Sequence, residues 1–85
     1  LVVTDKQGEA AVAEIEAWAN RIADSTDRTV RISVYDDADS NTYVLRLERG
    51  SRILLFRLSE AQVQTAERED ECEKTLTRKI KDLSG

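Results

Sequence analysis

The middle of the chain, residues 30–58, alternates between apolar and polar side chains with a period of two, and this pattern restricts the fold more than any other feature. A period of two is typical of a β-strand with one buried face. Gly50 and Ser51 interrupt the alternation with two residues that suit a tight hairpin turn, since glycine readily takes a positive φ. We therefore predict three antiparallel strands, with a polar loop at residues 36–41 between the first two.

The hairpin turn also predicts how the last two strands pair. If Arg49 lies opposite Arg52, one face of these strands is entirely apolar, whereas a slip of one residue would mix the two faces. The apolar inner face then consists of Val30, Ile32, Val34, Tyr43, Leu45, Leu47, Leu54, Phe56 and Leu58. The outer face consists of Arg31, Ser33, Tyr35, Thr42, Val44, Arg46, Ile53, Leu55 and Arg57.

Two helices are predicted on either side of the strands. Residues 5–24 follow a capping-box pattern at residues 4–7, and their apolar side chains recur every three or four residues, which places Trp18 in the core. A second capping-box pattern, Ser59-Glu60-Ala61-Gln62, predicts a helix over residues 60–83.

The second helix is long for the sheet that it must cover. Its 24 residues would extend over roughly 36 Å, whereas a seven-residue strand spans about 24 Å. We therefore expect either a kink near residues 70–74 or a partner outside the domain that contacts Leu76, Ile80 and Leu83.

Together these elements predict a single α+β domain over residues 1–85, with the order α-β-β-β-α and both helices on the apolar face of the sheet. This order of elements resembles the double-stranded-RNA-binding fold over nearly the whole chain. The resemblance implies phosphate contacts from a lysine cluster at the start of the second helix. Those positions read Ser59-Glu60-Ala61-Gln62-Val63 in this sequence and hold no lysine.

Composition argues against several kinds of chemistry. The 85 residues carry a net charge of −4 and include no histidine and one cysteine, so no histidine-containing triad, histidine-ligated zinc or intrachain disulfide can form. Gly8, Gly50 and Gly85 lie too far apart for a phosphate-binding loop. We therefore predict that the protein is not an enzyme, and we identify no cofactor, metal or small-molecule substrate.

Three local features have simple structural interpretations. Asp37-Ala38-Asp39-Ser40-Asn41 resembles half of a calcium loop, but Thr42 occupies the position of the necessary glycine, so we predict a polar hairpin loop. The acidic run from Glu67 to Glu73 is predicted to be a solvated helix face, and Cys72 to be a free thiol at the helix surface.

The outer face of the sheet is the most informative candidate for function, because it combines arginines with exposed aliphatic and aromatic side chains. We predict a non-catalytic protein-interaction or self-association module of an acidic, soluble, cytoplasmic protein with no membrane segment. Because the first residue is Leu1, we expect a processed protein or a piece of a longer one. The alternative is a nucleic-acid or anion binder that uses Arg31, Arg46 and Arg57. The candidate partner-binding residues are Arg31, Tyr35, Val44, Arg46, Ile53, Leu55, Arg57, Leu76, Ile80 and Leu83.

Overall fold

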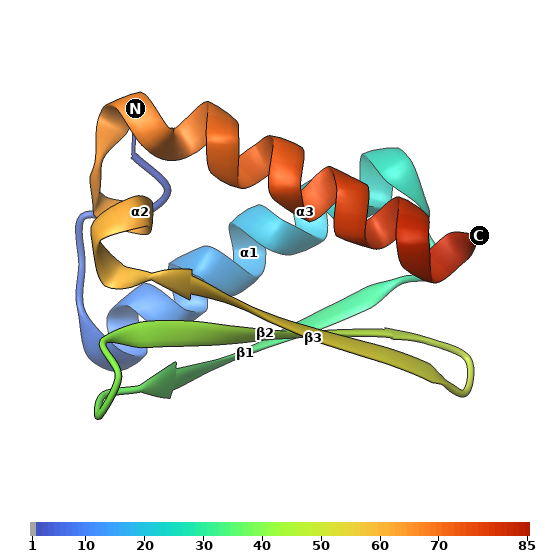
Figure 1. The fold of residues 1–85 in the computed structure, drawn as a ribbon, viewed down its shortest axis with the longest axis horizontal. Coiled ribbons are helices and arrows are strands. Elements are labelled where there is room, and N and C mark those ends of the chain that lie inside the picture. The colour runs from blue at the N-terminus through green and yellow to red at the C-terminus, as the bar shows by residue number, and fades with distance from the viewer. Residues whose placement is uncertain (1) are drawn as a thin grey trace.

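The computed structural model describes residues 2–85 and has two layers, a three-stranded antiparallel sheet and a layer of helices on one of its faces (Figure 1). The strands are β1 (Arg31–Asp37), β2 (Thr42–Arg49) and β3 (Arg52–Ser59), in the order β1-β2-β3. The helices are α1 (Gly8–Thr26), the short α2 (Glu60–Gln64), the 3₁₀ turn η1 (Ala66–Arg68) and α3 (Glu69–Ser84). The predicted α+β class is confirmed, with the last predicted helix divided into these three parts.

The predicted strand register is also confirmed. Arg49 lies opposite Arg52, and Gly50 between them has a φ of 61°, which suits the first central position of a tight hairpin turn. Seven of the nine predicted inner-face residues are buried, while Leu54 and Phe56 on β3 are half-buried. Trp18 packs in the same core, as predicted. The helix layer thus covers β1 and β2 more completely than it covers β3.

The first helix begins later than predicted, and the capping box predicted at residues 4–7 does not form. Gly8 has a φ of 64°, a left-handed conformation that prevents a helix from running through it from Asp5. Thr4 is buried instead of capping the helix, and its backbone N–H donates to the Val63 carbonyl at 3.1 Å. The N-terminal segment is therefore attached to α2, which lies next to it only in the folded chain.

The second capping box is confirmed, but the continuous helix predicted over residues 60–83 is wrong. The Gln62 N–H donates to Ser59 Oγ at 3.1 Å, and the Gln62 side chain accepts from the Ser59 N–H at 2.8 Å. The helix then ends at Gln64, because Thr65 takes an extended conformation with a φ of −106° and a ψ of 118°. The break therefore lies earlier in the chain than residues 70–74.

This break changes the interpretation of the late apolar stripe. After η1 the chain turns back, and α3 runs over the sheet beside α1 and in the same general direction (Figure 1). Its 16 residues extend over about 24 Å, the length of a strand, so no part of the stripe needs a partner. Leu76, Ile80 and Leu83 are buried in the chain's own core, and their prediction as partner-binding residues is wrong.

Cys72 also differs from its prediction, because the free thiol lies in the core rather than at the helix surface. It stands four residues before Leu76 and so begins the buried stripe of α3. Burial raises the pKa of the thiol, and the nearby Glu71 carboxylate adds to this effect. The side chain acts as a small apolar residue whose Sγ lies 3.7 Å from the Gln62 carbonyl oxygen.

Asp27 follows the last residue of α1 and joins this end of the helix to two distant parts of the chain, β2 and the end of α3. Its carboxylate accepts hydrogen bonds from the Ser84 hydroxyl at the end of α3 and from the Thr29 backbone and hydroxyl, and Arg49 Nε of β2 lies 3.2 Å away. These bonds, that of Ser84 most of all, hold the pKa of the Asp27 carboxyl well below its ordinary value of 3.8.

We therefore predict that Asp27→Asn destabilises the protein at neutral pH. Because the pKa is lower in the folded chain, the stabilisation is complete above the ordinary carboxyl pKa of 3.8 and is lost as the pH falls below it. Thermal melts of the wild type and the variant should differ clearly at pH 7, and the difference should shrink in acid. A difference that is constant from pH 7 to pH 2 would contradict this account.

Candidate functional site

The sheet face opposite the helices carries the large hydrophobic side chains that the fold leaves exposed. Tyr35 on β1 is 53% exposed, and Ile53 and Leu55 on β3 are 53% and 59% exposed. None of the helices that the structure describes in residues 2–85 covers this side of the sheet (Figure 1). We call it the open face and define it by the outward residues Arg31, Tyr35, Val44, Arg46, Ile53, Leu55 and Arg57.

The strand register arranges these side chains in three rows across the sheet. One row runs from Tyr35 through Val44 to Arg57. The middle row has Arg46 beside Leu55, and the third row ends on Ile53. Directly opposite side chains lie about 5 Å apart, so the rows form one continuous surface of apolar side chains, arginines and the Glu48 carboxylate, which lies between Arg31 and Ile53. The structure thus brings together the seven sheet residues predicted from the sequence.

Each arginine of the open face has a carboxylate partner within the chain. Arg57 Nη1 lies 2.8 Å from Asp37 Oδ2, and Arg46 Nη1 lies 3.0 Å from Glu48 Oε1. Arg31 makes a longer contact, of 3.9 Å, with Asp24. The hydrogen bond from Arg57 also lowers the pKa of the Asp37 carboxyl. These pairs hold the arginine side chains over the sheet and reduce the net positive charge that the face presents.

The polar loop between β1 and β2 is shorter than predicted, because Asp36 and Asp37 belong to β1 and the loop covers residues 38–41. Asp37 pairs with Thr42 at the base of the loop, and Asn41 turns the chain with a φ of 54°. Asp37 is directed to Arg57 rather than to a metal site. Within residues 2–85, no group of three or more acidic or cysteine side chains is placed to hold a metal ion.

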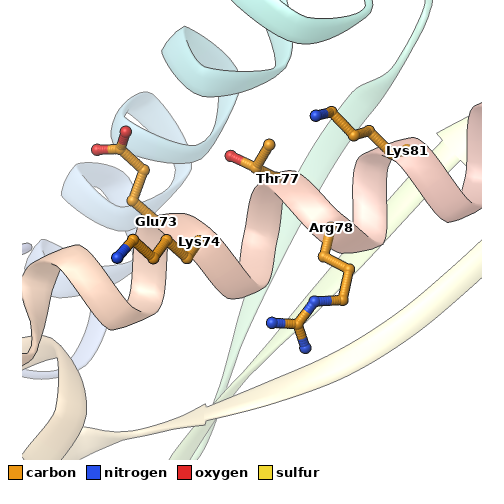
Figure 2. Close-up of a pocket in the computed structure, with 5 residues that line it drawn as sticks. All are labelled: Glu73, Lys74, Thr77, Arg78 and Lys81. Atoms are coloured by element: carbon orange, nitrogen blue, oxygen red, sulfur yellow. The ribbon is translucent and has the colours of Figure 1, made fainter.

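A shallow hollow on α3 was not predicted from the sequence. It has a volume of about 430 Å³ and is lined by Glu73, Lys74, Thr77, Arg78 and Lys81. Figure 2 shows that all five side chains project from one helix, so no second element forms an opposing wall. Lys74 is also paired with Asp70 at 3.1 Å. The hollow therefore lacks the enclosing, largely apolar walls of a typical small-molecule site.

Two polar residues of α1, Glu16 and Asn20, have a role that sequence reasoning missed. Asn20 Nδ2 donates to the Ile32 carbonyl at 2.9 Å, and its Oδ1 accepts from the Ile32 N–H at 3.1 Å. Glu16 Oε2 accepts from the Val34 N–H at 3.1 Å. Their spacing of four residues places them on one side of the helix, but only the packing of α1 against β1 shows that they bind a strand edge.

Comparisons with protein-family models, with curated proteins and with solved structures found no match for this chain. In residues 2–85, no helix combines the length and the apolar character needed to cross a bilayer.

Proposed function

We propose that this domain is a non-catalytic protein-interaction module that binds its partner through the open face, with self-association as the simplest use. The observation that supports the proposal is the exposure of Tyr35, Ile53 and Leu55 on one uncovered face. Contiguous exposed apolar side chains often mark a contact surface, and tyrosine and arginine are enriched in such surfaces.

The ion pairs of the arginines favour a protein partner over a polyanion. Nucleic-acid binding depends on cations that replace counterions on phosphates, and it weakens steeply with salt. Arg46 and Arg57 already have carboxylates at 3.0 Å and 2.8 Å, which a phosphate would have to displace. Nucleic-acid or anion binding remains the alternative, and a salt-dependent mobility shift with RNA or DNA would support it.

The proposal predicts that Tyr35→Thr weakens self-association by about tenfold, the typical effect of removing an aromatic anchor from an interface. Threonine suits a strand, and Tyr35 is exposed, so the fold should be retained. Sedimentation velocity over a series of concentrations measures the effect. Arg21→Ser on the exposed side of α1 is the matched control and should leave association unchanged.

Two outcomes would contradict self-association through the open face. One is a wild-type chain that stays monomeric at the highest concentration, with no concentration-dependent amide shifts on the open face. The other is a Tyr35→Thr variant that associates as strongly as the wild type.

A further inference from the structure

The two edges of the sheet are treated differently by the fold. The edge of β1 is occupied, because Asn20 and Glu16 of α1 bind the outward backbone groups of Ile32 and Val34. Unpaired edges tend to join other strands, and natural proteins commonly cover them. The sheet order β1-β2-β3 makes β3 the other edge.

The outward backbone groups of β3 follow from the pairing of the strands. In a two-residue hairpin the closing pair, Arg49 and Arg52, is hydrogen-bonded, and hydrogen-bonded pairs alternate with non-hydrogen-bonded ones. Ile53, Leu55 and Arg57 therefore direct their N–H and C=O groups away from β2. Outside the β2–β3 ladder, no hydrogen bond within residues 2–85 uses these backbone groups.

The side chains beside this edge are also incompletely buried. Leu54 and Phe56 are half-buried on the helix side of the sheet, and Ile53 and Leu55 are more than half exposed on the open face. The edge of β3 thus combines free backbone groups with apolar side chains on both faces, a combination that favours the addition of another strand.

We propose that β3 pairs in antiparallel fashion with β3 of a second copy of this chain, around a two-fold axis at Leu55, to form one continuous six-stranded sheet. This inference rests on the self-association part of the proposed function, since it specifies how two copies meet, and it does not require Tyr35, which lies on β1 at the opposite edge of the sheet. It goes further in that backbone groups of the edge, rather than side chains of the open face, provide the hydrogen bonds.

The charges and apolar groups of β3 fit a second copy in this register. A two-fold axis places residues opposite each other whose side chains lie on the same face of the sheet. The register between the two β3 strands can therefore change only in steps of two residues. With Leu55 opposite its own copy, Arg57 lies opposite Ile53 and Arg52 opposite Leu58, so no arginine faces another arginine. The half-buried Leu54 and Phe56 then lie opposite each other and cover one another.

Cysteine cross-linking tests this register directly. Opposed residues of a hydrogen-bonded pair have Cα atoms about 5.5 Å apart, within the range that a disulfide spans. Leu55→Cys should therefore form a disulfide-linked dimer under mild oxidation. Ile53→Cys is the matched control, because two copies of residue 53 would lie about 13 Å apart. The native Cys72 is buried and does not compete.

A proline variant tests the role of the backbone. Leu55→Pro removes an N–H that points away from β2, so the β2–β3 ladder keeps its bonds while the dimer loses both central ones. Dimerisation should weaken by about tenfold or more, as expected for two lost hydrogen bonds, whereas Leu55→Thr, which keeps the N–H, should weaken it less. Circular dichroism checks that each variant is folded.

The outcomes separate this inference from the proposed function. Equal cross-linking of the Leu55→Cys and Ile53→Cys variants, or none for either, would overturn the edge pairing even if the chain self-associates. Cross-linking specific to residue 55, combined with no effect of Tyr35→Thr, would support the edge pairing and contradict binding through the open face. If Leu55→Pro does not fold, the cross-linking pair alone decides.

Discussion

Leu76→Asp is expected to unfold the domain. Leu76 is fully buried in α3, between Cys72 and Ile80 of the same stripe. Truncation of a buried leucine costs about 2–5 kcal/mol, and a buried unpaired carboxylate adds to this cost. Small domains are stable by only about 5–15 kcal/mol, so the variant should be largely unfolded at 25 °C. Far-UV circular dichroism and urea denaturation measure the loss.

The same substitution at Leu55 provides the control. Leu55 is 59% exposed on the open face, so Leu55→Asp should change the free energy of unfolding by only about 0.5 kcal/mol. Together the two variants show whether a leucine belongs to the core, as in the stripe on α3, or lies on an exposed contact surface. If Leu76→Asp were to remain folded with a wild-type melting curve, α3 could not pack as described.

Asn20→Ala is expected to have the second-largest effect. The substitution removes both hydrogen bonds to Ile32 and a third, of 2.9 Å, from Nδ2 to the Glu16 carbonyl. Leaving such backbone groups without partners costs about 1–3 kcal/mol. It also uncovers part of the β1 edge, so each chain would present two edges that can pair. A chain with two open edges can form open-ended assemblies rather than a closed dimer.

Urea denaturation gives the stability loss, and light scattering at several concentrations gives the size of the assemblies. The neighbouring variant Arg21→Ala is the control, because Arg21 is exposed on α1 and should affect neither measurement. An Asn20→Ala variant with wild-type stability and unchanged scattering would show that Asn20 does not protect the edge.

The sheet could be predicted from the sequence because its pattern is local and redundant. The two-residue turn at Gly50-Ser51 and the alternation of residues 43–58 both favour one register, and a shift by one residue would expose the apolar face. The alternation of apolar and polar residues also predicted which side chains lie on the open face, among them Tyr35, Ile53 and Leu55. Trp18 followed from helical spacing for a similar reason.

The helix ends could not be predicted in this way, because distant contacts decide them. Thr4-Asp5-Lys6-Gln7 has the composition of a capping box, but the Thr4 backbone binds Val63, about 60 residues later in the sequence. The break at Thr65 has no proline or glycine to signal it. The break depends on the length of the sheet, because α3 matches that length only when the chain has first turned back.

The sequence alone therefore determined the strands, their register and the identity of the outward side chains, since each depends on neighbours along the chain or across one tight turn. Only the tertiary structure decided that Leu76, Ile80 and Leu83 belong to the core. It also decided that Asn20 and Glu16 cover the β1 edge of the sheet while the β3 edge stays open. The physical reason is that burial and backbone hydrogen bonding at an edge depend on which elements pack together, and no local period encodes that arrangement.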